Sequence, residues 1–286
     1  MTDLPAGLSA LADRYDVLLC DVWGVIHNGV ESFPEACQAL VEWRAHHGPV
    51  ILISNSPRPS AAVVEQLDRL GVPREAWSAF VTSGDATRAL LRERAPGPVW
   101  AVGPDRDAVL YEGLGLAFAG PQDAAFVSVS GMKDDEVETP EDYRQALAVA
   151  AERGLALVCA NPDRVVQRGD RLIYCGGSLA DLYESLGGQV LMAGKPYAPI
   201  YDLALAEAQA LKGGPVDRAR VLCIGDGVIT DVKGAQDQDL ACLFIAKGIH
   251  GEAAIGPDGR LDHAKVEGLL AAEGVGATHA MGDLVW

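Results

Sequence analysis

The sequence predicts an α/β protein built on a parallel sheet, with a second, smaller α/β domain inserted into the first. Short apolar runs alternate with longer amphipathic stretches, which is typical of strands and helices in alternation. Residues 84–188 carry strand and helix patterns of their own. Hydrophobic residues make up 49% of the 286 positions and charged residues 22%, an ordinary globular composition that excludes extensive disorder.

The first domain is expected to hold six buried strands and five helices, with boundaries 1–83 and 189–286. The predicted strands are Val17–Cys20, Val50–Ile53, Ala79–Val81, Gln189–Met192, Val221–Ile224 and Ala241–Ile245. The predicted helices are Pro34–His47, Ser60–Leu70, Ala198–Leu211, Asp231–Gln238 and His263–Glu273. Alternation of this kind favours a parallel sheet with helices on both faces.

The inserted domain, residues 84–188, is expected to hold four strands and two helices. The predicted strands are Val99–Val102, Phe126–Val129, Leu155–Cys159 and Arg171–Tyr174. The predicted helices are Asp85–Arg94 and Pro140–Arg153, and Gly176-Gly177 is interpreted as a turn.

The net charge limits the partners of the chain, and the cysteines indicate its compartment. The formal net charge is −17, so a phosphate backbone or an anionic lipid surface would be repelled, and neither nucleic acid nor membrane is expected as a partner. The six cysteines form no Cys-x-x-Cys pair and lie mostly in apolar runs, which is typical of buried thiols in a reducing compartment. The start of the sequence carries no basic region followed by an apolar stretch, and we expect a cytoplasmic protein.

Polar side chains follow the predicted strands of the first domain where each strand ends. They are Asp21, Ser54, Asn55, Lys195, Asp226 and Asp231. Because ligands gather at the carboxyl ends of parallel strands, we expect these groups to meet at one edge of the sheet. Carboxylates held close together repel and need a counter-charge, which Mg²⁺ supplies while keeping ligand positions for waters and a phosphate. A carboxylate beside such a cation can attack phosphorus and form an aspartyl phosphate.

Taken in order, these motifs resemble those of the haloacid dehalogenase (HAD) superfamily. The resemblance is to the class IIA capped hydrolases, the NagD-like or p-nitrophenyl-phosphatase-like group, and it covers nearly the whole chain. The runs that carry it are CDVWGV (20–25), SNSPR (54–58), TSGDAT (82–87), ANPD (160–163), GKP (194–196) and GDGVITD (225–231). It implies a Rossmann-like parallel-sheet core with a large inserted α/β cap domain of the C2 type.

The resemblance also implies roles for single residues. Asp21 would be the nucleophile and a Mg²⁺ ligand, and Trp23 would offer its backbone carbonyl to the same ion. Asp226 and Asp231 would complete the metal site. The remaining groups would bind the phosphoryl group or the rest of the substrate: Ser54, Asn55 and Lys195 for the phosphoryl group, and Arg58, Asn161, Asp163 and the Gly176-Gly177 turn for the substrate.

Trp23 departs from the pattern of the family. Phosphatases of this family normally carry a second Asp two residues after the nucleophile, which protonates the leaving oxygen and then activates water. Indole cannot replace it, since its N–H only donates a hydrogen bond. Three explanations stay open: a leaving group that needs no proton, another acid such as His27 or Asp163, or a protein that binds phosphorylated ligands and turns them over slowly or not at all.

The resemblance therefore implies a Mg²⁺-dependent phosphatase of small phosphate monoesters, of the nucleotide or sugar phosphate class, with p-nitrophenyl phosphate as a substrate in vitro. The alternatives are a catalytically weakened phosphometabolite-binding or sensor protein and a phosphotransferase. The expected partner is a small phosphorylated metabolite. Related capped phosphatases often form dimers, so a homodimer is compatible with the resemblance.

Overall fold

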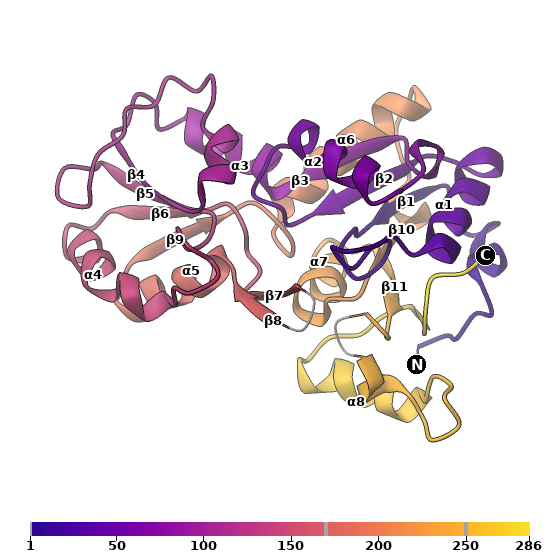
Figure 1. Cartoon of the computed structure of the whole chain (residues 1–286). Coiled ribbons are helices and arrows are strands. Elements are labelled where there is room, and N and C mark those ends of the chain that lie inside the picture. Colours follow the sequence, from indigo (N-terminus) through magenta and orange to yellow (C-terminus); the bar gives the residue numbers. More distant parts are fainter. Residues whose placement is uncertain (1, 169–170, 249–250) are drawn as a thin grey trace. The chain divides into compact units, whose positions relative to one another are not determined.

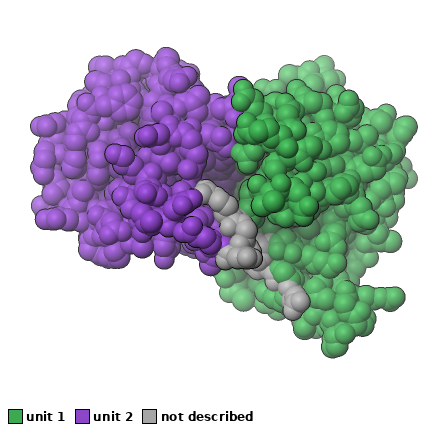
Figure 2. Space-filling view, viewed as in Figure 1, with its two compact units in different colours: residues 1–54, 64–81, 195–286 green, residues 55–63, 82–194 purple. Residues whose placement is uncertain are grey.

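The computed structural model describes residues 2–168, 171–248 and 251–286. Figure 2 shows the two compact units into which the chain divides. The core unit holds residues 1–54, 64–81 and 195–286, and the insert unit holds residues 55–63 and 82–194. None of the helices in the described part of the chain is long and apolar enough to span a bilayer.

The core unit is built on a six-stranded sheet of order β12-β11-β10-β1-β2-β3 (Figure 1). The strands are β1 Val17–Cys20, β2 Val50–Ser54, β3 Ala79–Thr82, β10 Val221–Gly225, β11 Ala241–Ile245 and β12 His279–Met281. β1 pairs in parallel with both β2 and β10, and β10, β11 and β12 continue in the same sense. All residues of β1, β2 and β10 are buried, as their near-continuous apolar sequences predict for a parallel sheet covered on both faces.

The helices associated with the core sheet pack large apolar side chains against it. They are α1 Pro34–His46, α2 Ser60–Arg69, α6 Ala198–Lys212, α7 Lys233–Asp237 and α8 His263–Ala272, with one turn of π-helix at Val228–Val232. Trp43 of α1, Tyr201 of α6 and Phe244 of β11 are among the largest fully buried side chains. The expected α/β class with a parallel sheet is confirmed.

The insert unit has its own parallel sheet, of order β4-β5-β6-β9, and a separate hairpin of β7 and β8. The strands are β4 Val99–Val102, β5 Phe126–Val129, β6 Ala156–Cys159, β7 Val165–Arg168, β8 Arg171–Tyr174 and β9 Gln189–Met192. The helices are α3 Ser83–Arg92, α4 Arg144–Glu152 and α5 Gly176–Ser185. A reciprocal capping box between Thr82 and Asp85 fixes the start of α3.

Two sequence expectations about the insert are wrong. Gln189–Met192 was expected in the sheet of the first domain, but as β9 it pairs with β6 in the insert sheet and is only half-buried. A four-residue apolar run does not reveal which of two sheets it joins. Gly176-Gly177 is the start of α5 rather than a turn, and a Cβ on Gly177 would lie 2.2 Å from the Pro162 carbonyl oxygen, so glycine permits the close packing there.

The boundaries of the two compact units differ from the residue ranges expected for the two domains. Residues 55–63, 82–83 and 189–194 lie with the insert unit. The division into a core domain and a cap domain remains a proposal.

An ion-pair cluster just before β1 gives a pH-dependent prediction. The Asp16 carboxylate accepts hydrogen bonds from Arg220 at 2.6 Å and Lys212 at 3.1 Å, and these lower the pKa of Asp16 to about 2. A depressed carboxyl pKa stabilises the fold above the unfolded value of about 3.9, and this stability is lost as pH falls towards 2. Because Asp16 is partly exposed, solvent screening reduces the effect to about 0.5 kcal/mol.

Asp16→Asn is therefore expected to lower the free energy of unfolding by about 0.5 kcal/mol at pH 7 and by nothing measurable near pH 2. Urea unfolding of both proteins at the two pH values measures this. Asp202→Asn, an exposed carboxylate on α6, is the control. A difference of the same size at both pH values would contradict the assignment.

Candidate active site

Three neighbouring strands of the core sheet end at the candidate site. Asp21 directly follows β1, Ser54 is the last residue of β2, and Asp226 directly follows β10. β1 lies between β2 and β10, so these three side chains are carried by the centre of the sheet. Asp231 comes from the π-helical turn after β10, and Lys195 lies three residues before α6. The structure thus gathers groups from four separate stretches of sequence.

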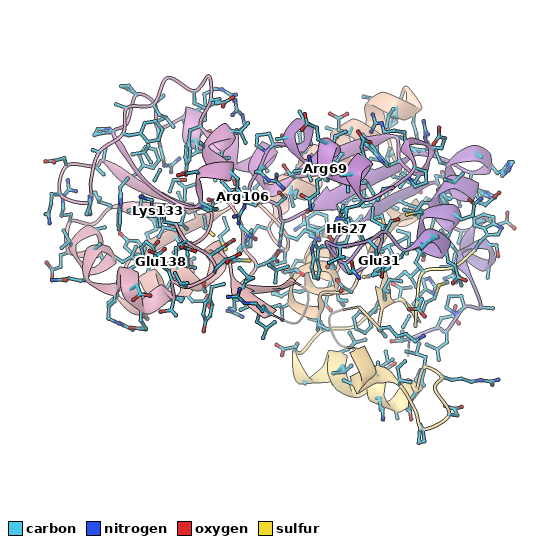
Figure 3. All side chains as sticks on the ribbon, viewed as in Figure 1. His27, Glu31, Arg69, Arg106, Lys133 and Glu138 are labelled. Carbon is cyan, nitrogen blue, oxygen red and sulfur yellow. The ribbon has the colours of Figure 1, made fainter. Side chains whose placement is uncertain are left out.

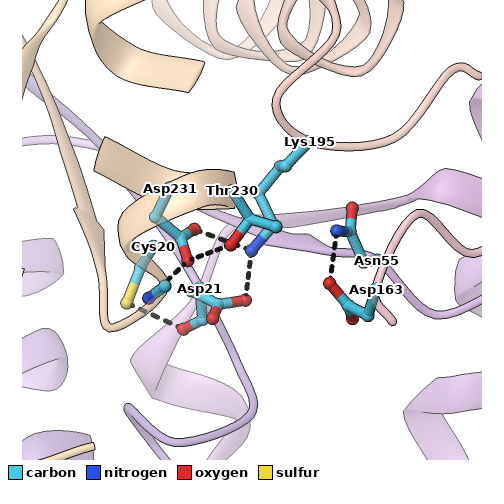
Figure 4. A network of polar contacts seen from close by, with 8 residues as sticks. Cys20, Asp21, Asn55, Asp163, Lys195, Thr230 and Asp231 are labelled. Carbon is cyan, nitrogen blue, oxygen red and sulfur yellow. Dashed lines mark hydrogen bonds and ion pairs between the residues drawn. The ribbon is translucent and has the colours of Figure 1, made fainter. Parts of the chain in front are cut away.

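Lys195 joins two of the carboxylates. Its Nζ lies 2.6 Å from Asp21 Oδ1 and 2.7 Å from Asp231 Oδ1 (Figure 4), and the residue is only 2% exposed. Burial alone would lower the pKa of Lys195, but the charges of Asp21 and Asp231 outweigh it and hold that pKa above its usual value. The lysine is therefore a fixed positive charge beside Asp21.

Asp21, Asp226 and Asp231 form a buried carboxylate cluster. Each offers an oxygen, and these oxygens all lie within 4.8 Å of one another. Burial, together with the charge of Asp231, raises the pKa of Asp21 well above its ordinary value, although Lys195 acts in the opposite direction. One lysine does not balance three buried carboxylates, and hard oxygen donors at this spacing suit a divalent cation such as Mg²⁺.

Glycines let the backbone approach Asp226 closely from two sides. A Cβ added at Gly24 or at Gly248 would lie 2.1 Å from Asp226 Oδ2, and Gly24 also has a positive φ of 83°. Any larger residue at either position would displace this carboxylate. No local pattern around Gly24 or Gly248 indicated these contacts with Asp226.

The second carboxylate oxygen of Asp231 accepts hydrogen bonds from the turn that carries this residue. Oδ2 accepts hydrogen bonds from the Gly227 N–H at 3.1 Å and the Thr230 hydroxyl at 3.3 Å (Figure 4). A Cβ at Gly225 would lie 2.2 Å from Asp231 Cγ, so the glycine allows the carboxylate to fold back over the end of β10. The supporting role of Thr230 was not expected from the sequence, although the residue lies within the quoted GDGVITD run.

Trp23 lies in a loop that holds its ring in place. A Cβ added at Gly29 would lie 3.2 Å from Trp23 Nε1, and the rings of Trp23 and His27 meet edge to face at 6.4 Å. His27, labelled in Figure 3, accepts a hydrogen bond at Nδ1 from the Gly29 N–H at 3.0 Å. Burial lowers the pKa of His27 to about 4, so it is uncharged at neutral pH and poorly suited to act as an acid there.

Three of the residues expected to bind the phosphate or the substrate meet within the insert unit. The Asn55 side-chain amide donates to Asp163 Oδ1 at 2.8 Å (Figure 4), and Asn161 Oδ1 accepts from the Asp163 N–H at 3.1 Å. Asn55 is buried and Asp163 is half-buried. The contact orients the Asn55 amide, whose chain neighbour Ser54 ends β2.

Arg58 is tied into the insert through its backbone. Its carbonyl oxygen accepts from the Thr82 hydroxyl at 2.8 Å. Burial raises the pKa of the Asp107 carboxyl, and Ser130, Arg106 and Arg58 act against this rise. Arg106 is labelled in Figure 3. This charged group around Arg58 was not expected from the sequence, since its members lie at distant positions along the chain.

Comparison with known proteins identifies the family of the chain. A model of the haloacid dehalogenase-like hydrolases matches residues 18–117, and a HAD-hydrolase-like model matches residues 192–272. A crystal structure of a haloacid dehalogenase-like hydrolase from Brucella suis 1330 is 47% identical, with a TM-score of 0.88, and the match covers 99% of this chain and 100% of that one.

Two curated proteins are more distant relatives. The 5'-nucleotidase YutF of Bacillus subtilis (strain 168) is 25% identical over 82% of this chain and 88% of its own length. D-glycerol 3-phosphate phosphatase of Mycobacterium tuberculosis (strain ATCC 25618 / H37Rv) is 25% identical over 85% of this chain and 66% of its own length. The family resemblance expected from the sequence is confirmed: this chain belongs to the haloacid dehalogenase-like hydrolases.

Proposed function

We propose that the chain is a Mg²⁺-dependent phosphatase that hydrolyses small phosphate monoesters through an aspartyl phosphate on Asp21. One observation carries this proposal: the Lys195 ammonium lies between Asp21 and Asp231, within a cluster whose three carboxylates offer oxygens within 4.8 Å of one another. Such a site combines an oriented carboxylate nucleophile with positive charge for the phosphoryl oxygens.

Each residue would have a separate task in this reaction. Asp21 would attack phosphorus with the oxygen that does not face Lys195, while the ammonium holds the carboxylate in position and attracts the phosphate. The Ser54 hydroxyl and the Asn55 amide would donate hydrogen bonds to phosphoryl oxygens. Preorganised donors of this kind stabilise the charge that develops in the transition state.

The metal would be held by the three carboxylates, Asp21, Asp226 and Asp231, with the backbone carbonyl of Trp23 as a further oxygen ligand. When bound, Mg²⁺ would neutralise charge on the carboxylates and on the phosphate. The donor set fits this ion because every group is a hard oxygen and all three carboxylates are buried.

The substrate would be a small phosphorylated metabolite of the nucleotide or sugar phosphate class. The relatives named as a 5'-nucleotidase and a D-glycerol 3-phosphate phosphatase support small phosphate monoesters as substrates. Arg58, Asn161 and Asp163 would contact the part of the substrate beyond the phosphate. All six cysteines are free and buried, which supports a reducing compartment such as the cytoplasm.

Trp23 favours a second candidate function, a phosphometabolite-binding protein with weakened catalysis. An indole in place of a carboxylate two residues after Asp21 removes a proton donor, which is worth roughly 10²–10⁴-fold in rate. The intact arrangement of Asp21 and Lys195 with the other carboxylates supports catalysis instead.

Phosphate release from p-nitrophenyl phosphate, with Mg²⁺ and with a chelator, tests the proposal. We expect release that requires Mg²⁺ and persists in Asp202→Asn, a control on the exposed surface of α6. Absence of release, together with Mg²⁺-dependent binding of a phosphate analogue such as vanadate, would favour the binding protein. Release accompanied by transfer of the phosphoryl group to an added alcohol would favour the phosphotransferase.

A further inference from the structure

We propose that Trp23 determines which leaving groups this site accepts: phosphates whose leaving oxygen departs as a stable anion, namely aryl, enol and acyl phosphates, react well, and alkyl phosphates react poorly. The proposal rests on the proposed phosphatase function and narrows its substrate class. The groups that surround Asp21 in the core unit support the proposal.

The chemistry of the first step determines which leaving groups need a proton donor. When the Asp21 oxygen bonds to phosphorus, the bond from phosphorus to the leaving oxygen breaks, and the electron pair stays on that oxygen. A phenol ionises near pH 10, as tyrosine does, so an aryl oxide can depart unprotonated and take its proton from water afterwards. An alkyl oxide is far more basic and needs a proton as the bond breaks, which a general acid supplies.

The acidic groups of the cluster are already engaged. Asp21 is the attacking group, and one of its oxygens faces Lys195 at 2.6 Å. Both oxygens of Asp231 are hydrogen-bonded, one to Lys195 at 2.7 Å and the other to the Gly227 N–H at 3.1 Å. Asp226 Oδ2 is enclosed by Gly24 and Gly248. Among the described residues, no fourth Asp, Glu, His or Cys joins this three-carboxylate cluster.

Trp23 lies in the short loop that leads away from Asp21. The Asp21 N–H donates to the Ile224 carbonyl at 2.8 Å, so the chain is still extended along the sheet there. β1 ends at Cys20, and Trp23 lies in the loop that follows. The next residue, Gly24, lies against the carboxylate cluster, since a Cβ there would come within 2.1 Å of Asp226 Oδ2. The half-buried indole is thus carried by the loop that borders the cluster, and its N–H does not release a proton in a useful pH range.

The loop after Trp23 fixes the ring rather than supplying an acid. Gly29, with a φ of 85°, lets the indole nitrogen lie against the backbone, where a Cβ would come within 3.2 Å. His27 Nδ1 accepts a hydrogen bond from the Gly29 N–H, and the imidazole ring packs edge-on against the indole. The imidazole is thus part of the support of Trp23. A rigid aromatic wall of this kind also suits a planar leaving group.

After the first step, water attacks the phosphorus of the aspartyl phosphate. The bond from phosphorus to Asp21 breaks, the carboxylate is regenerated, inorganic phosphate leaves, and the proton from water passes to the solvent. Atoms and charges therefore balance without a further reagent.

The test compares kcat/KM for aryl phosphates with progressively less acidic phenols and for an alkyl phosphate, glycerol 3-phosphate, all with Mg²⁺. For the wild type we expect a steep decline along the aryl series and a loss of at least about 100-fold for the alkyl ester. Trp23→Asp should raise kcat/KM for the alkyl ester at least about 10-fold more than for p-nitrophenyl phosphate. Trp23→Phe, which keeps an aromatic ring, should retain the steep decline.

Alkyl and aryl esters hydrolysed at similar rates by the wild type would overturn the proposal, and this comparison does not depend on any variant being folded. Equal effects of a folded Trp23→Asp on both esters would also overturn it, because the tryptophan would then act through its shape alone. No hydrolysis of any ester would instead contradict the proposed phosphatase function, so the two failures are distinguishable.

Discussion

Asp21→Asn is expected to reduce Mg²⁺-dependent phosphate release by at least about 10⁴-fold, the order of loss seen when a catalytic nucleophile is removed. An amide has nearly the size of the carboxylate but is a poor nucleophile and brings no negative charge to a cation. The fold should persist, because Asp231 still pairs with Lys195 at 2.7 Å and one of three mutually repelling carboxylates is gone. Initial rates on p-nitrophenyl phosphate and thermal unfolding without metal measure the two effects.

The control for this variant is Asp202→Asn, which removes a carboxylate from the exposed surface of α6. It should change neither the rate nor the unfolding temperature measurably. If folded Asp21→Asn kept a rate within about 10-fold of the wild type, Asp21 would not be the nucleophile and the aspartyl phosphate mechanism would fail.

Much of the candidate site could be predicted because its polar residues lie directly at the ends of apolar runs in the sequence. Asp21, Ser54 and Asp226 each follow or end an apolar run, and the rule that parallel strands present their carboxyl ends together brings them to one edge. The strand order β10-β1-β2, which makes them neighbours, comes from crossover connections between distant segments. The resemblance of the motifs to those of the family indicated that these strand ends belong to one site.

Contacts between distant residues could not be predicted in the same way. Asn55 and Asp163 are 108 positions apart, and nothing in either local sequence indicates that the amide of one donates to the carboxylate of the other. The same holds for Gly248, which approaches Asp226 because β11 lies beside β10. Gln189–Met192 was assigned to the wrong sheet because its four residues satisfy a strand pattern equally well in either place.

Lys195→Met is expected to destabilise the metal-free protein by about 3–5 kcal/mol, the usual cost of removing one partner from a buried ion pair. Lys195 is 2% exposed and bridges Asp21 and Asp231, so methionine would leave these carboxylates facing each other and Asp226 with no positive charge between them. Phosphate release should also fall by about 10²–10³-fold, since the group that attracts the phosphoryl oxygens is lost. Denaturant unfolding and initial rates measure the two losses.

The stability loss should depend on pH and on Mg²⁺. The pKa of Asp21 is already raised by burial and by Asp231, and removing Lys195 takes away the charge that opposes this rise. An acid whose pKa is raised in the folded state destabilises the fold above its unfolded pKa, and the destabilisation shrinks as pH falls through the folded pKa. The deficit of Lys195→Met should therefore be larger at pH 8 than at pH 5, and Mg²⁺ should reduce it at pH 8 by supplying the missing positive charge.

Lys233→Met is the matched control, because Lys233 pairs with Asp237 on the exposed surface of α7 at 2.8 Å. An exposed pair of this kind is worth about 0.3–0.5 kcal/mol, and its loss should respond to neither Mg²⁺ nor a change from pH 8 to pH 5. Equal losses in the two variants would mean that the buried lysine does not balance the carboxylate cluster. A deficit at position 195 that Mg²⁺ relieves would instead show that lysine and cation share one task, holding together three carboxylates that would otherwise repel.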